Sequence, residues 1–192
     1  TEALPGALPV GRNSPQRCAY GLYAEQLTGS AFTAPRHANL RSWLYRIRPS
    51  VVQSAYTPLE NGRVATSPLA RPAADPNQMR WHAPPIPAVP TDFIDGLLTI
   101  AANGDAAVQA GCGVHLYAFN RGMGERVFCC ADGELLLVPQ QGTLLLCTEL
   151  GLLTAGPGEV AVLPRGLKFR VETAPGSDAA RGYACENYGS PF

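Results

Sequence analysis

The chain has 192 residues, of which 46% are hydrophobic and 16% charged, and its 15 basic residues balance its 15 acidic ones. A net charge of zero argues against a dedicated nucleic-acid binder, because such a domain is usually basic. No apolar run approaches the roughly 18 residues that a membrane-spanning helix needs, and no basic-then-apolar signal segment opens the chain.

Residues 1–90 are predicted to form an extended N-terminal arm and an irregular segment with a few strands. The opening TEALPGALPVGRNSPQ is rich in proline and glycine and has no lasting period. Ser42–Arg48 alternates, with Trp43, Tyr45 and Ile47 on one side, which predicts a strand ended by Pro49. Beyond it lie the proline-rich runs VATSPLARPAADPNQ and HAPPIPAVP, with one short strand expected at residues 79–81 between them.

The pattern changes in residues 91–192, which are predicted to form a second domain. Short apolar runs recur there, each bounded by Gly, Pro, Asn or Asp. Short strands separated by turn residues at regular intervals favour an antiparallel jelly roll or β-sandwich. The runs are DFIDGLLTIAANG, GVHLYAFN, RVFCC, ELLLVPQ, GTLLLCTE, GLLTAG, EVAVLP, LKFRVE and RGYACENY.

One motif concerns metal binding directly. Gly158, Pro164 and Gly166 are spaced like the glycines and proline of the second conserved motif of the cupin jelly rolls, G-x5-P-x-G-x2-H. In metal-binding cupins the last position is a histidine that points into the barrel, but here it is Phe169. The stretch that corresponds to the first cupin motif, residues 118–126, contains no histidine, and Glu125 is one residue out of register with the acidic position. The resemblance therefore implies a cupin-like domain without a metal site.

The chain's three histidines are not spaced like metal ligands. His115 shares a strand face with Tyr117 and Phe119, which favours a hydrogen-bonded packing residue over a ligand. His82 precedes two prolines, which is typical of a turn, and His37 lies beside an arginine. No nucleophile motif is present either, so no catalytic, cofactor-binding or metal-binding residue is predicted in this chain.

Arginines interleave with aromatic residues near the N-terminus, at positions 36, 41, 46 and 48. A nucleic-acid surface is one interpretation. Because the net charge is zero, we favour arginines that pair with carboxylates at a domain or subunit contact. The six cysteines form no CxxC pair, which predicts free thiols in a reducing compartment rather than a disulfide framework or zinc site.

Long strings of this sequence resemble the N-terminal region of the homogentisate 1,2-dioxygenase family. The strings are residues 20–50 (YGLYAEQLTGSAFTAPRHANLRSWLYRIRPS), 75–81 (DPNQMRW), 92–96 (DFIDG), 132–142 (DGELLLVPQQG), 162–171 (VLPRGLKFRV) and 186–189 (ENYG). The resemblance implies a cytoplasmic, ferrous iron enzyme that opens the ring of homogentisate with O₂ to give maleylacetoacetate, in tyrosine and phenylalanine breakdown. It also implies a homo-oligomer, a hexamer built as a dimer of trimers, with neither nucleic acid nor membrane as a partner.

In that family two His and one Glu hold the iron in a later part of the protein, and no residue here matches them. The expectation is thus an N-terminal fragment that is inert alone, with Fe(II) bound outside it. The alternative is a metal-free cupin that acts as a binding or assembly module. An iron-binding second half encoded downstream of Phe192 would support the first interpretation, and a stop codon there the second.

Overall fold

The computed structural model describes residues 5–6, 19–26, 37, 43–69, 76–78, 80 and 82–192. In these ranges the protein is mainly β, with eleven strands and short 3₁₀ turns such as η1 (Ala19–Gly21) and η3 (Ser50–Val52). No helical segment there has the length and hydropathy to span a bilayer. The chain divides into two compact units: unit 1 is Thr1–Leu59 with Glu149–Gly151, and unit 2 is Glu60–Thr148 with Leu152–Phe192.

Unit 1 contains a two-stranded antiparallel sheet of β1 (Tyr23–Gln26) and β2 (Trp43–Arg46). The strand predicted for residues 42–48 therefore exists but is shorter. The prediction that Ile47 packs beside Tyr45 is wrong, because Ile47 lies in a bend after the strand and is 66% exposed. The chain stops alternating there, two residues before Pro49. Of the short strand predicted at residues 79–81 the structure describes only Arg80, which is in no strand.

Arg46 is the polar centre of unit 1. Its Nη1 donates to Glu25 Oε2 at 2.6 Å, while Nε and Nη2 donate to the two oxygens of Glu149 at 2.7 and 2.8 Å. A bidentate pairing of this kind matches the planar fork of a guanidinium to a carboxylate. For Arg46 the predicted pairing with carboxylates is confirmed, Arg48 is exposed, and the other two arginines of the group lie outside the described residues.

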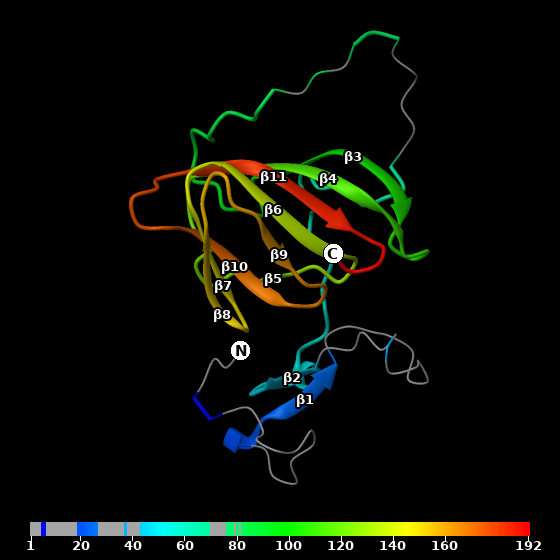
Figure 1. Ribbon diagram of the computed structural model, residues 1–192, viewed down its shortest axis with the longest axis vertical. Coiled ribbons are helices and arrows are strands. Elements are labelled where there is room, and N and C mark those ends of the chain that lie inside the picture. Colours follow the sequence, from blue (N-terminus) through cyan, green and yellow to red (C-terminus); the bar gives the residue numbers. More distant parts are fainter. Residues whose placement is uncertain are drawn as a thin grey trace. The chain divides into compact units, whose positions relative to one another are not determined.

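Unit 2 is an antiparallel β-sandwich, and each of the nine predicted apolar runs forms one of its strands. One sheet has the order β5-β10-β7-β8 and the other β3-β4-β11-β6-β9 (Figure 1). The predicted mainly β, jelly-roll-like class is confirmed. The strands are β3 (Leu97–Asp105), β4 (Ala110–Phe119), β5 (Phe128–Cys129), β6 (Glu134–Gln141), β7 (Leu144–Thr148), β8 (Gly151–Ala155), β9 (Ala161–Leu163), β10 (Lys168–Thr173) and β11 (Ala180–Asn187).

The core of unit 2 lies between these two sheets. Successive side chains of a strand point to opposite faces, so alternate residues are buried. In β10, Phe169 and Val171 are buried while Arg170 between them is exposed. From β4, Tyr117 meets the ring of Phe93 at a centroid distance of 5.3 Å. Burial of large side chains such as these contributes about 1.5–3 kcal/mol each.

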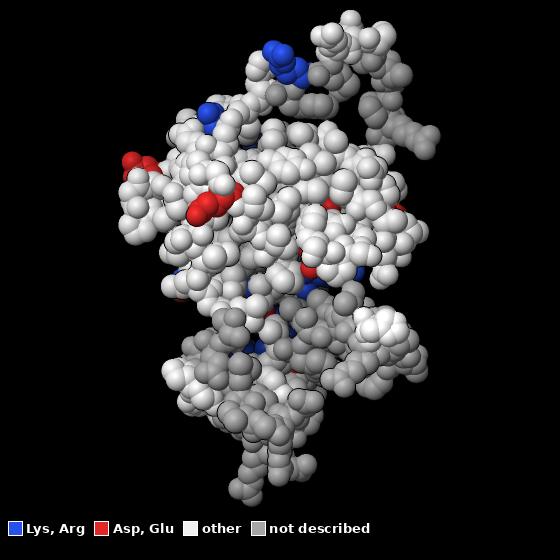
Figure 2. All heavy atoms as spheres, viewed as in Figure 1, with Lys and Arg blue, Asp and Glu red and all other residues white. Residues whose placement is uncertain are grey.

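The opposite, outer face of the five-stranded sheet is also apolar. The strand register aligns two adjacent rows of side chains there, which we call the outer band. Its members are Leu98, Leu116, Tyr183 and Val138 in one row and Val114, Cys185, Leu136 and Val162 in the next. Most are partly exposed. Figure 2 shows few charged side chains on the side of unit 2 that faces the viewer, in keeping with the low charged fraction of the chain.

Candidate functional site

Phe169 occupies the interior position that the cupin resemblance assigned to a metal ligand. The turn before it is tight: Gly166 has φ +82° and donates its N–H to the Cys130 carbonyl at 2.8 Å. β10 then begins and places the Phe169 ring in the core, only 2% exposed, edge-on to Phe128 at a centroid distance of 5.5 Å. The Phe169 ring therefore packs against another aromatic ring in the core. A phenyl ring offers no ligand atom to a metal.

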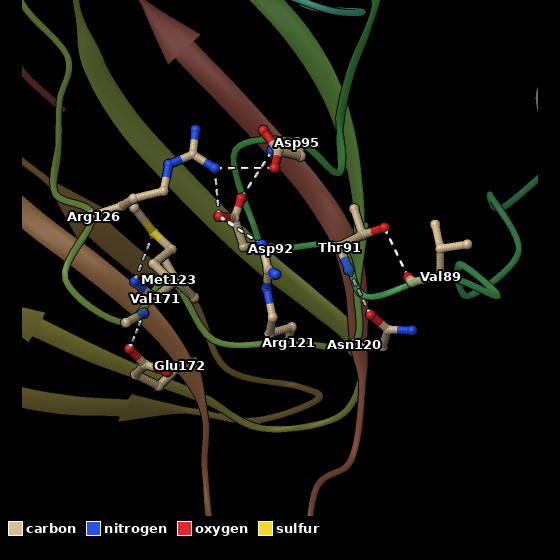
Figure 3. Close-up of polar contacts among 11 residues, drawn as sticks. Val89, Thr91, Asp92, Asp95, Asn120, Arg121, Met123, Arg126, Val171 and Glu172 are labelled. Atoms are coloured by element: carbon tan, nitrogen blue, oxygen red, sulfur yellow. Dashed lines mark hydrogen bonds and ion pairs between the residues drawn. The ribbon is translucent and has the colours of Figure 1, made fainter.

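The loop that corresponds to the first cupin motif is held by an ion-pair network (Figure 3). Asp92, fully buried, accepts from Arg126 Nη1 at 2.5 Å and from the Asp95 N–H at 3.1 Å. Arg126 Nη1 also lies 3.0 Å from Asp95 Oδ2, and Arg121 approaches Asp92 at 3.8 Å. Glu125, the nearest match to the motif's acidic position, is exposed. The network fixes where the loop lies and leaves Glu125 outside the interior.

Five side chains make a second, largely buried polar group, which we call the His115 cluster: Thr99, His115, Cys130, Glu186 and Tyr188. His115 Nδ1 lies 2.9 Å from Thr99 Oγ1, and its Nε2 lies 3.5 Å from Glu186 Oε2. Glu186 accepts from the Cys130 thiol at 2.8 Å and from the Tyr188 hydroxyl at 3.3 Å. The prediction that His115 faces inward with Tyr117 as a hydrogen-bonded packing residue agrees with this geometry.

Electrostatics in the His115 cluster favour a charged Glu186 and a neutral Cys130. Burial acts to raise the pKa of the Glu186 carboxyl, but hydrogen bonds with His115 and Cys130 outweigh it, so that this pKa lies below its usual value. Burial, followed by the neighbouring Glu186 charge, raises the pKa of the Cys130 thiol to about 12. Since the thiolate is the nucleophilic form, Cys130 acts as a hydrogen-bond donor and not as a nucleophile.

These groups do not fit an iron site. A mononuclear non-heme iron usually takes two His and one carboxylate with open positions. In the part of the chain that the structure describes, no three His, Cys, Asp or Glu side chains gather as metal ligands would. In the His115 cluster the one carboxylate is already surrounded by hydrogen-bonding partners.

A groove of about 480 Å³ opens on the outer band. Its floor is apolar, from Ile100, Leu116 and Val138, and its polar groups come from His82, Gln140 and Tyr183. His82, predicted to lie in a turn, is an exposed residue outside helices and strands and forms part of the wall. His37 is exposed and belongs to unit 1.

The family described as homogentisate 1,2-dioxygenase N-terminal matches residues 1–192, the whole chain. The chain belongs to this family. Several of the solved structures that resemble it are described as cupins. It is 17% identical to a cupin-2 domain protein of Shewanella frigidimarina (40% of this chain and 70% of that one, TM-score 0.35).

Two other solved structures are similarly distant. A cupin with a double-stranded β-helix fold from Methanocaldococcus jannaschii is 13% identical over 40% of this chain and 69% of its own, with TM-score 0.35. A cupin 2 barrel protein of Leptotrichia buccalis is 15% identical over 47% of this chain and 39% of its own, with TM-score 0.39.

Sequence reasoning did not predict the partners of His115. Glu186 and Tyr188 are two residues apart near the end of the chain, and Cys130 follows Cys129 without a recognisable motif. A detectable signal existed, because a carboxylate and a tyrosine at i and i+2 at the end of an apolar strand lie on one face. What the sequence could not show is that β4 and β11 are neighbours.

Proposed function

We propose that this chain is the non-catalytic N-terminal part of an enzyme that opens the aromatic ring of homogentisate with O₂. The observation that carries the proposal is Phe169, which fills a ligand position with a buried ring in a chain of the homogentisate dioxygenase family. The product would be maleylacetoacetate, and the whole enzyme would be a cytoplasmic homo-oligomer, a hexamer built as a dimer of trimers. Ferrous iron, held outside this segment, would supply the oxygen chemistry.

In this proposal the chain serves as a scaffold. The Asp92 network pins a loop, and the His115 cluster joins β4, β11 and the turn before β6 through side-chain contacts. The outer band offers an apolar surface on which another part of the enzyme could rest. None of these roles needs a group that changes its bonding during the reaction.

Oxygen uptake tests the proposal. The 192-residue chain and the full-length enzyme are each mixed with Fe(II) and homogentisate in an oxygen electrode, and iron retained after desalting is measured on the same samples. We expect uptake and bound iron for the full-length enzyme and neither for the chain alone. Ring cleavage by the chain alone would refute its inertness, and a full-length enzyme inactive toward homogentisate would refute the substrate.

A metal-free binding or assembly module is the second candidate, and the groove on the outer band is the observation that favours it. Its apolar floor and few polar groups are typical of small-molecule sites. If the chain is such a module, it will act without the iron-binding part. A full-length enzyme whose activity requires residues 1–192 covalently attached would favour the first candidate.

A further inference from the structure

Two cysteines outside the His115 cluster lie close together on the outer face of the five-stranded sheet. In the pairing of β4 with β11, Cys112 is opposite Asn187 and Cys185 is opposite Val114. Along the two strands, one residue pair, Gly113 opposite Glu186, lies between the positions of the two cysteines. Because side chains two positions apart share a face, both point to the outer side, as diagonal neighbours.

The two thiols are neighbours on this face, and Tyr183, two residues before Cys185 in β11, lies on the same side. Burial, followed by the neighbouring Cys185, raises the pKa of Cys112. Such a pKa shift slows the reaction of a thiol at neutral pH without preventing it.

Neither cysteine is fully buried. Cys112 and Cys185 are each partly exposed, unlike the buried Cys130. Tyr183, on the same face of β11 as Cys185, lines the groove of about 480 Å³.

We propose that Cys112 and Cys185 are a reversible dithiol–disulfide site that exchanges with low-molecular-weight disulfides. One cysteine thiolate attacks a sulfur of the small disulfide, forms a mixed disulfide and releases one small thiol. The second cysteine then attacks the mixed disulfide at the protein sulfur and releases the other small thiol. The protein loses two electrons and two protons, and the small disulfide is reduced to two thiols.

The diagonal geometry makes this disulfide easy to reduce. Diagonal Cα atoms on neighbouring antiparallel strands are about 7–8 Å apart. The Cα atoms of two cysteines joined by a disulfide are usually about 5.5–6 Å apart. Closing the bond must draw β4 and β11 together, and the sheet resists this. Strained disulfides are the labile ones, so the oxidised form is expected to reopen in a thiol-rich environment.

Peptide mapping of the intact chain tests the site. The protein is incubated with oxidised glutathione, free thiols are blocked with an alkylating agent, and peptides are analysed by mass spectrometry. We expect a cross-link between Cys112 and Cys185, with the loss of two hydrogen atoms, which excess reduced glutathione removes. Alkylation of both cysteines, or glutathione on each without a cross-link, would overturn the proposal, as would a cross-link that reduced glutathione cannot open.

Matched variants identify the two steps. Cys112→Ser and Cys185→Ser should each leave glutathione trapped on the remaining cysteine, because the resolving thiol is gone. Cys129→Ser is the control, since Cys129 is exposed and belongs to the other sheet, and it should form the cross-link as the wild type does. A cross-link lost in Cys129→Ser would assign the reaction to a different pair. Mapping of the wild type decides the question even if a serine variant does not fold.

Discussion

Glu186 shows how a single half-buried residue ties stability to pH. Its pKa is held below the usual value because hydrogen bonds with His115 and Cys130 outweigh the opposing effect of burial. A carboxyl whose pKa is depressed in the folded state stabilises the protein above its unfolded pKa, about 4.3 for Glu. That stabilisation is lost as the pH falls through the folded pKa.

Replacing Glu186 by Gln should remove this pH dependence. We expect the free energy of unfolding of the wild type, measured by urea titration, to fall more steeply below about pH 4.3 than that of Glu186→Gln. At pH 7 the variant should be the less stable, by roughly 1–3 kcal/mol, because charged hydrogen bonds are lost. Glu125→Gln, at an exposed glutamate, is the control and should follow the wild type. Parallel acid profiles for wild type and Glu186→Gln would contradict the assignment.

Single residues were only partly predictable from the sequence. The inward direction of His115 follows from its place two residues before Tyr117 in an alternating strand. Phe169 was likewise placed in the interior by the spacing of Gly158, Pro164 and Gly166. The acceptor of His115 was not predictable, because its strand neighbours come from distant parts of the sequence. Ile47 was wrongly placed since a short alternation gives no sign of where the strand stops.

At the level of elements, β4 approaches the His115 cluster through a glycine. A Cβ at Gly113 would lie 2.8 Å from the Tyr188 hydroxyl oxygen and 3.0 Å from His115 Nε2. Both atoms belong to buried rings with little freedom to move. The absence of a side chain at this position of β4 leaves the space in which the two rings meet Glu186.

Gly113→Ala should therefore destabilise the fold, although glycine-to-alanine changes in a strand often stabilise by restricting the unfolded chain. We expect a loss of about 1–3 kcal/mol from overpacking, seen as a lower urea midpoint with unchanged slope. Gly189→Ala is the matched control, because its Cβ would find its nearest atom at 3.4 Å, an ordinary contact. Equal midpoints for the two variants would show that the ring positions can adjust.

The nine strands of unit 2 were predicted because each apolar run ends in turn residues. Their order in the sheets was not, since β11 lies between β4 and β6 although it comes last in the chain. Runs such as ELLLV and TLLLC are continuous rather than alternating. Continuous runs are typical of strands covered on both faces. In β6 the run contributes Leu135 and Leu137 to the core and Leu136 and Val138 to the outer band.

At the scale of the whole molecule, the outer band exposes apolar side chains to water, which is unfavourable. Contiguous apolar patches on soluble proteins commonly mark contact surfaces. We expect the isolated chain to associate as its concentration rises, measured by sedimentation velocity. Val162→Lys, which adds a charge at the 41% exposed end of the band, should weaken this association about tenfold, the equivalent of ~1.4 kcal/mol.

The control for that experiment is Val108→Lys, at a 68% exposed valine in the turn between β3 and β4. It adds the same charge away from the band and should leave association unchanged. A chain that stays monomeric at high concentration would show that the band needs no cover. The domain limit predicted at residue 90 and the extended N-terminal arm remain predictions, and residues 1–4 and 7–18 lie outside the described part of the chain.

Thr99 gives the His115 cluster a link to the protein surface. Its hydroxyl oxygen accepts the Ala65 N–H at 2.9 Å, lies 2.9 Å from His115 Nδ1, and can donate to the Ala65 carbonyl at 3.4 Å. A hydroxyl has one hydrogen to give. When His115 Nδ1 carries no hydrogen, the Thr99 hydroxyl can donate to it. When Nδ1 carries a hydrogen, the Thr99 hydroxyl accepts from Nδ1 and can donate to the Ala65 carbonyl instead. Rotation of one O–H bond thus couples the hydrogen-bonding state of an interior ring to an exposed loop without moving a strand.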